Sequence, residues 1–495
     1  MSLRRDVTRG IFWVAVAQFS GKLVAFIVQV ILARILVPAD FGLVALAYLA
    51  LDSLHLFAEM GFTSALIYRK DRVQEASYTV FSMVIVAGLV LSVLGVAVSP
   101  LIASFFKEPR VTPVLRVLSM TILLASFGQV PISLLAKETD FRKRFVPMVV
   151  PGLVSGLVSV TCALAGLGVW SLVAGRVADA LITSVAAYLV CNWRPRLTFD
   201  RHLAREMFDY AKHIIGSQLL IFGITNVDNT FVGRILGPAG LGVYNLAYNL
   251  SNLPATQITR IVGQVMFPAF SKIRDDGAAM RRVFFETMRY VSMLSVPVSV
   301  GFIVFAGDFI YILYGEKWMA AVAPLQLLGV YGLIRSVAAN MGNVFKAGGR
   351  PKWLTYIALW RLITMVLFLY PATKYYGIVG VSALSAVVSV VDFFISATLV
   401  NRIVHARATD YIRCLGPIMA VSITSAIVGR LAQEQFRAVP HARIAFLTAL
   451  LLMGVVYAAG MWLVDKDLRR MVQRMAREYG PKVGFFDSDE GQPPR

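Results

Sequence analysis

Residues 34–52 read RILVPADFGLVALAYLALD, and residues 234–252 read RILGPAGLGVYNLAYNLSN. The two stretches lie 200 residues apart and align without a gap. They share the Arg-Ile-Leu start, a Pro-Ala pair, a glycine and a Leu-Ala-Tyr triplet. Because a repeat at fixed spacing decides how a whole chain is organised, we interpret the stretches as copies from an internal duplication. Each copy is predicted to be a short turn between two helices, since proline and glycine interrupt the apolar sequence there.

The composition of the 495-residue chain predicts a polytopic membrane protein. Hydrophobic residues make up 58% of it and charged residues 15%, whereas a soluble globular protein carries about 25% charged residues. Arg4, Arg5 and Arg9 precede a long apolar run that lacks a small-residue cleavage site. We therefore expect a retained first transmembrane helix rather than a removed signal peptide.

A helix that crosses a bilayer needs about 20 apolar residues. In lipid only helices and closed barrels satisfy the backbone, and no extended apolar alternation suggests a barrel. The predicted fold class is therefore all-α, with about 14 transmembrane helices. The predicted spans are 11–33, 41–67, 77–105, 112–136, 144–166, 168–191, 210–233, 240–263, 284–306, 321–345, 353–373, 377–401, 411–431 and 443–464.

Lysine and arginine gather in every second predicted loop, about thirty on one side against about nine on the other. The positive-inside rule then predicts a multi-pass protein with both termini in the cytoplasm. Most of the lysines and arginines behind the net charge of +20 are therefore expected on the cytoplasmic surface, where they face anionic membrane lipids. Nucleic acid is not an expected partner.

The longest internal loop falls just before the second copy of the repeat and divides the chain. We predict a six-helix bundle in 1–191, a cytoplasmic linker in 192–209, a second six-helix bundle in 210–403, two extra transmembrane helices in 404–464 and a basic cytoplasmic tail in 465–495. Because each half holds an even number of helices, the two copies enter the membrane in the same direction, as parallel repeats do.

Polar residues recur at helical spacing in the spans that flank both turns, and each polar group inside a membrane is a functional hypothesis. They form stripes that we interpret as the lining of one water-filled cavity, rather than as packing contacts inside a bundle. The predicted substrate-binding residues on these stripes are Gln18, Lys22, Gln29, Tyr48, Asp52, His55, Gln218, Asn229, Tyr248 and Asn252.

Charged residues in the spans suggest two further roles. Arg335 and Arg361 lie deep enough to offer positive charge to a phosphate-bearing substrate, which arginine binds in a bidentate manner. Arg176 and Asp179, three residues apart, are expected to neutralise one another as a structural pair. The candidates for coupling to an ion are Asp52, Glu59 and Asp228.

The sequence disfavours an enzyme. It contains no GxxxxGK[ST] phosphate loop and no HExxH motif, and no loop is large enough to house a hydrolase or glycosyltransferase site. Its three cysteines, Cys162, Cys191 and Cys414, have no metal-ligand spacing. We therefore predict no catalytic residues, no metal and no cofactor.

Three segments resemble a known family: RILVPADFGLVALA from Arg34, QVPISLLAKE from Gln129 followed by Asp140-Phe-Arg, and Gly168-Val-Trp-Ser-Leu-Val. They are similar to polysaccharide flippases of the multidrug/oligosaccharidyl-lipid/polysaccharide exporter superfamily, in its lipopolysaccharide and colanic-acid exporter branch. The resemblance runs over about residues 5–460.

The resemblance implies two six-helix bundles in a V shape that work by alternating access. It implies as cargo an undecaprenyl-diphosphate-linked oligosaccharide, a repeat unit of a surface polysaccharide, which moves from the cytoplasmic to the periplasmic leaflet of the bacterial inner membrane. In the wider superfamily the first, second, seventh and eighth helices line most of the cavity, as the stripes predict here. A polysaccharide polymerase and glycosyltransferases are the further partners expected.

Three alternatives stay open. A lipid II flippase of the same superfamily has a cationic cavity too, but segments 34–52 and 129–142 fit the polysaccharide branch better. A cation-coupled multidrug exporter would use Asp52 or Asp228 as its cation site, but the fourteen predicted spans exceed the twelve usual for that group. A structural component of a polysaccharide-synthesis complex would not require the buried charges.

The expected mechanism assigns the polar residues to the parts of this cargo. Lys22, with Arg335 or Arg361, would offset the charge of the diphosphate. Asparagine, glutamine and tyrosine side chains would bond to sugar hydroxyls, while the lipid tail stays in the membrane. Rocking about residues 192–209 would then expose the head group on the other side.

Overall fold

The computed structural model describes residues 20–59, 66, 69, 71–137, 141–273, 276–435, 442–465 and 469. Within its helices, the side chains of 56, 58, 59, 141–144, 207–221, 257–265, 267–269, 271, 272 and 442 are not described. Among the predicted site residues, Gln18 and the side chains of Glu59 and Gln218 therefore lie outside the described part.

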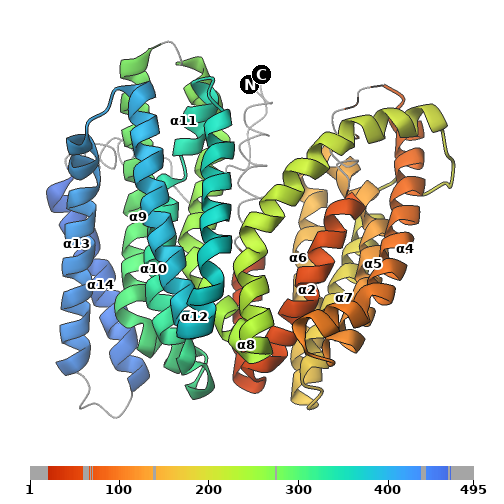
Figure 1. Ribbon diagram of the computed structural model, residues 1–495, viewed down its shortest axis with the longest axis horizontal. Helices are drawn as coiled ribbons and strands as arrows, with labels where there is room; N and C mark the ends of the chain where they lie inside the picture. The colour runs from red at the N-terminus through yellow and green to blue at the C-terminus, as the bar shows by residue number, and fades with distance from the viewer. Residues whose placement is uncertain are drawn as a thin grey trace, which may run out of the picture. The chain divides into compact units, whose positions relative to one another are not determined.

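All regular secondary structure in the described part is helical (Figure 1), which confirms the predicted class. Residues 20–35 form the first helix, and it is followed by α2 (Pro38–Glu59), α4 (Val73–Phe106), α5 (Val111–Lys137), α6 (Phe141–Leu164), α7 (Val169–Val190), α8 (Arg201–Lys272), α9 (Gly277–Leu313), the 3-10 helix η1 (Glu316–Ala321), α10 (Val322–Ala338), α11 (Met341–Ala347), α12 (Lys352–Val404), α13 (Ala408–Gln435) and α14 (Ala442–Val464).

In the described ranges, nine helical segments are long and apolar enough to cross a membrane. Two of the long helices change direction inside their length. Gly237 interrupts α8 with φ 73°, and Gly377 interrupts α12 with φ 59°. Because this backbone region is strained for any residue with a Cβ, glycine is what allows the chain to turn there. The long apolar helical segments make the chain an all-helical multi-pass membrane protein.

The turn of the first repeat is built from local hydrogen bonds. Pro38 begins α2, where its missing N–H costs nothing and its fixed φ suits the helix. The Asp40 carboxylate accepts a hydrogen bond of 3.3 Å from the Val37 backbone N–H. In the second repeat the break at Gly237 directly precedes Pro238. Both turns therefore lie where the Arg-Ile-Leu-x-Pro-Ala pattern predicts them.

The two repeats touch each other through these turns, in a reciprocal contact. A Cβ added to Gly42 would lie 1.7 Å from the Pro238 carbonyl oxygen, and one added to Gly242 would lie 2.0 Å from the Pro38 carbonyl oxygen. No side chain can be accommodated at such distances. The glycine that each copy contributes therefore allows its helix to approach the backbone of the other copy.

The arginine of each turn contacts a helix far away in the sequence. Arg34 Nε donates a 2.7 Å hydrogen bond to the Leu313 carbonyl oxygen, and Arg34 Nη2 also donates to Ile312, so this guanidinium caps the end of α9. The guanidinium of Arg234 lies 5.4 Å from the ring centroid of Phe105, near the end of α4.

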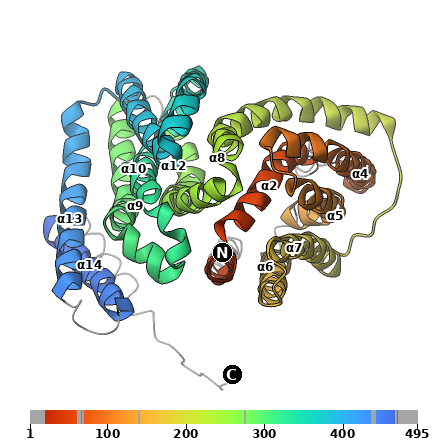
Figure 2. The ribbon, with the colours of Figure 1, turned by 60° about the horizontal axis from the view of Figure 1, so that its bottom comes forward.

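Two compact units make up the chain. The first comprises Met1–Ser251, Ala306–Tyr331 and Lys352–Asp392, and the second comprises Asn252–Phe305, Gly332–Pro351 and Phe393–Arg495. In the first unit α2 packs against α4, α5 and α7, while α6 packs along α7. In the second unit α13 lies beside α14 (Figures 1 and 2). The predicted division at 191 and 209 follows different boundaries and stays a prediction.

The start of α8 is set by an aspartate. Residues 191–200 have no regular secondary structure, and α8 begins at Arg201, so residues 201–209 of the predicted linker are helical. Asp200 Oδ1 accepts hydrogen bonds from the N–H groups of His202 (2.9 Å) and Leu203 (3.2 Å). This is the arrangement of a helix N-cap.

Candidate functional site

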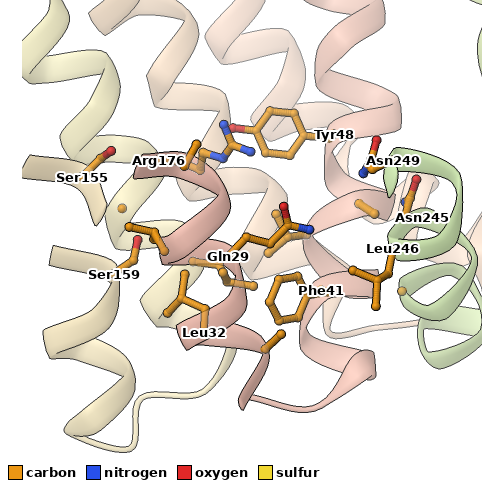
Figure 3. A pocket seen from close by; sticks show the side chains of 18 of the residues that line it. Gln29, Leu32, Phe41, Tyr48, Ser155, Ser159, Arg176, Asn245, Leu246 and Asn249 are labelled. Atoms are coloured by element: carbon orange, nitrogen blue, oxygen red, sulfur yellow. The ribbon is translucent and has the colours of Figure 1, made fainter. Parts of the chain in front are cut away.

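A cavity of about 510 Å³ lies within the first unit. Its walls come from helix 20–35, α2, α6, α7 and both halves of α8, and Trp318 of η1 also lines it (Figure 3). Helix 20–35 and α2 flank the turn of the first repeat, and the two halves of α8 flank the turn of the second. The cavity therefore lies between the two repeats. The sequence placed its polar stripes on these same helices.

One wall of the cavity carries charge. On α2, Tyr48 and Asp52 lie one helical turn apart, and on α7 Arg176 and Asp179 do the same. The Arg176 guanidinium lies 5.0 Å from the centroid of the Tyr48 ring (Figure 3), a cation–π contact. Both carboxylates interact electrostatically with this exposed guanidinium. A planar cation of this kind can bind two oxygens of a phosphate together.

The facing wall carries carboxamides. Both halves of α8 contribute to it, with Asn226 and Asn229 before the break and Asn245 and Asn249 after it. Figure 3 shows Asn245 and Asn249 on the α8 side, facing Tyr48. Gln29 extends from helix 20–35 into the space between the two walls. A carboxamide both donates and accepts hydrogen bonds, as a sugar hydroxyl also does.

Asn229 has an unused hydrogen-bonding atom at this wall. The residue is 9% exposed, and its Nδ2 donates to Asn226 Oδ1 over 3.4 Å. Within the described residues its Oδ1 is buried without a hydrogen-bond partner. A buried acceptor without a partner costs free energy, and a donor supplied by a ligand would offset that cost.

Apolar side chains close one end of the cavity next to the repeat turns. Leu32, Phe41 and Leu246 lie there (Figure 3). The Phe41 ring packs edge-on against Trp318 at 5.3 Å between centroids. Trp318 Nε1 donates a 2.9 Å hydrogen bond to the Ala33 carbonyl oxygen. The contact between repeats and this aromatic pair thus seal the same end.

Four predicted site residues line the cavity: Gln29, Tyr48, Asp52 and Asn229. Lys22 is exposed on helix 20–35, and His55 is half-buried on α2; neither belongs to the lining. Their proposed roles stay predictions.

Other predicted site residues lie in contacts away from the lining. The rings of Tyr248 and Tyr331 are 5.9 Å apart between centroids. Arg361 Nη1 lies 3.9 Å from Asp392 Oδ2 in the first unit. In the second unit Arg335 Nη1 donates a 3.0 Å hydrogen bond to Asn252 Oδ1. These arginines already have polar neighbours inside the fold.

Asp228, a candidate for ion coupling, is buried behind the amide wall. Its Oδ2 accepts a 2.7 Å hydrogen bond from the Tyr244 hydroxyl, and its Oδ1 accepts one of 2.8 Å from the Asn229 N–H. It is therefore linked through the backbone to a residue of the cavity. The described residues hold no cluster of His, Cys, Asp and Glu suited to a metal ion.

Sequence reasoning did not assign several cavity residues to the site. They are Ser155, Ser159, Arg176, Asp179, Asn226, Asn245 and Asn249. The spacing of Arg176 and Asp179 predicts a structural pair, and in the structure both also line the cavity. The contact of Arg176 with Tyr48 on a neighbouring helix marks it as a site residue. Sequence spacing within one helix cannot predict such a contact between helices.

The sequence is similar to known proteins of polysaccharide biosynthesis. A family model described as polysaccharide biosynthesis protein matches residues 31–323. The teichuronic acid biosynthesis protein TuaB of Bacillus subtilis is 25% identical over 90% of this chain and 94% of its own. The succinoglycan biosynthesis transport protein ExoT of Rhizobium meliloti is 27% identical over 97% of each chain.

Solved structures share the fold. The inward closed conformation of the lipid II flippase MurJ aligns with a TM-score of 0.71 at 15% identity, over 92% of this chain and 99% of that one. An inward-facing multidrug resistance MATE family transporter of the MOP superfamily aligns with a TM-score of 0.61 at 18% identity, over 78% and 96%. These comparisons confirm the resemblance stated from sequence.

Proposed function

The chain belongs to the polysaccharide biosynthesis protein family, a family of transporters rather than enzymes, and on that basis we propose that it flips an undecaprenyl-diphosphate-linked oligosaccharide. The cargo would be the repeat unit of a surface polysaccharide. It would move from the cytoplasmic to the periplasmic leaflet of a bacterial inner membrane by alternating access. Fourteen spans, two six-helix bundles with two extra helices, and cytoplasmic termini are part of this proposal.

The observation that carries the proposal is the pairing of a guanidinium wall with a carboxamide wall in one cavity. Arg176 would bind the diphosphate, and Asn226, Asn229, Asn245 and Asn249 would bond to sugar hydroxyls. In this proposal Arg176 takes the role expected from the sequence for Lys22 with Arg335 or Arg361, because Arg176 lines the cavity.

The charges around Arg176 suggest how binding remains reversible. In the structure the guanidinium has the Tyr48 ring and the Asp52 and Asp179 carboxylates as neighbours. An arriving diphosphate would replace part of this environment, while the carboxylates would repel it. Such competition limits the affinity of the cavity for the head group, which favours its release on the far side. The apolar lipid tail would remain in the bilayer.

The proposal is tested by lipid profiling of a strain that lacks the protein. We expect one undecaprenyl-linked oligosaccharide to accumulate in the inner membrane, measured by mass spectrometry, and a surface polysaccharide to be lost. Wild-type protein should restore export. Arg176→Ala should not restore it at an equal level of membrane protein, and Arg176→Lys should restore it only in part, because lysine cannot form a bidentate contact.

Arg116→Ala is the matched control. Arg116 is another exposed arginine of the first unit, on α5, and it bonds to Ser99 instead of lining the cavity. Its loss should leave export intact. Full export by Arg176→Ala would overturn the role of that residue. An unchanged lipid profile together with greater sensitivity to cationic drugs would favour the drug-exporter alternative, with Asp52 at a cation site.

A further inference from the structure

A second cavity, of about 640 Å³, lies within the second unit and is separate from the proposed transport site. It is formed by the first turns of α9, the first turns of α13 and the end of α14. Four arginines line it: Arg281, Arg282, Arg289 and Arg413. The carboxylates in the lining are Glu286, Asp410 and Asp465.

Two of the four arginines form ion pairs across the cavity. Arg281 Nη2 lies 2.6 Å from Asp410 Oδ2, which joins α9 to α13. Arg289 pairs with Asp465, a carboxylate that is 3% exposed and lies at the end of α14. These pairs fix the three helix ends around the cavity.

The other two arginines, Arg282 and Arg413, are exposed. In the part of the chain that the structure describes, neither forms an ion pair or a hydrogen bond with a side chain. Arg413 interacts electrostatically with Asp410, whose ion-pair partner is Arg281. Glu286 is one helical turn from Arg282 without forming an ion pair with it. The cavity therefore offers two guanidinium groups to a ligand.

The rest of the lining is apolar apart from the thiol of Cys414: Ala278, Phe285, Pro417, Ile418, Met461 and Val464. The cavity is thus amphipathic, with cations and an apolar wall side by side. It lies at the ends of three helices that can each cross a membrane. That is the depth of lipid head groups, and basic pockets between membrane helices bind anionic head groups at this depth. The partial positive charge at the N-termini of α9 and α13 adds to the attraction.

We propose that this cavity binds an anionic glycerophospholipid of the surrounding bilayer. Arg282 and Arg413 bind its phosphate, and an acyl chain lies along Phe285, Ile418 and Met461. The bound lipid then joins α9 to α13 and α14 in addition to the ion pairs. The inference does not depend on the transported cargo.

The test uses the full-length protein, purified in detergent and stripped of lipid. The probes are phosphatidylglycerol, phosphatidylcholine and inorganic phosphate, and the readouts are the Tm and the lipid bound in native mass spectrometry. We expect phosphatidylglycerol to raise the Tm and to bind at least about tenfold more tightly than phosphatidylcholine. The double variant Arg282→Ala/Arg413→Ala should lose about tenfold in affinity or more, since charged hydrogen bonds are the strong ones.

The matched control is Arg402→Ala/Arg407→Ala, which removes two exposed arginines from the same unit outside the cavity. It should bind phosphatidylglycerol as wild type does. If both double variants lost the same affinity for phosphatidylglycerol, general surface charge would explain the binding, and the proposed site would be wrong. An equal Tm rise with inorganic phosphate alone would overturn the lipid assignment. Should the double variant not fold, the single variants Arg282→Ala and Arg413→Ala give the same comparison.

Discussion

Substituting Gly42 by alanine tests the contact between the repeats most directly. The added Cβ would lie 1.7 Å from the Pro238 carbonyl oxygen, whereas ordinary van der Waals contact begins at 3.4 Å. Both partners are backbone, so no side chain can rotate away, and the two turns must separate by about 1.7 Å. Forced overpacking costs about 1–3 kcal/mol or more, against a gain in helix propensity of about 1 kcal/mol. Because the clash is with a backbone carbonyl, we take the upper end of that range, about 3 kcal/mol, and subtracting the propensity gain leaves a net destabilisation of about 2 kcal/mol.

The measurement is the Tm of purified protein in detergent, with Gly223→Ala as the control. Among the described residues, a Cβ at Gly223 meets no atom within 4 Å, so that variant should be neutral or slightly stabilised. Gly242→Ala should behave like Gly42→Ala, since its Cβ would lie 2.0 Å from the Pro38 carbonyl oxygen. The double variant should cost less than the sum, because both changes act on one contact. A wild-type Tm for Gly42→Ala would refute the reasoning.

Three further predictions concern single side chains. Tyr244→Phe removes a 2.7 Å hydrogen bond to the buried Asp228 carboxylate and should lower the unfolding free energy by about 2 kcal/mol; an unchanged unfolding curve would contradict that contact. Lys22 lies outside the cavity lining, so Lys22→Ala should leave export near normal at an unchanged level of membrane protein; a loss of export would return the diphosphate-binding role to Lys22. The backbone N–H groups of Leu203 and His202 hold the pKa of Asp200 below its ordinary value. The ionised cap therefore stabilises the protein fully above the pKa that Asp200 has in the unfolded chain. This stabilisation is lost as the pH falls through the lower pKa that Asp200 has in the folded protein. Asp200→Ala should therefore lower the Tm at pH 7 and lower it by less at pH 3, which is below the ordinary pKa of an aspartate; an equal Tm loss at both would exclude a charged cap.

The helices and both repeat turns were predictable because they depend on local signals. Apolar run length gives the helices, and the Pro-Ala pattern gives the turns. The predicted span 321–345 shows the limit of this reasoning, since the structure divides it into α10 and α11 just before Met341. Asn340 at that break is a polar residue in an apolar window, and composition alone does not mark it as a helix boundary.

The site was less predictable because its charges depend on partners from other helices. The predicted stripe on α2 includes Tyr48 and Asp52, and both residues line the cavity. Spacing could not show that Arg335 bonds to Asn252 or that Arg361 faces Asp392. Polar residues on one helix face are visible in a sequence, whereas the neighbour that each of them meets is a property of the tertiary fold.

The reciprocal contact of Gly42 with Pro238 and Gly242 with Pro38 has the geometry of an isologous interface, in which residue i of one copy meets residue j of the other and j meets i. A shorter chain with one copy of the motif would bury the same contact by pairing with a second copy of itself about a twofold axis. Gene fusion would then have made a homodimer contact intramolecular. It would also have freed the two cavity walls to diverge, one toward Arg176 and the other toward asparagine.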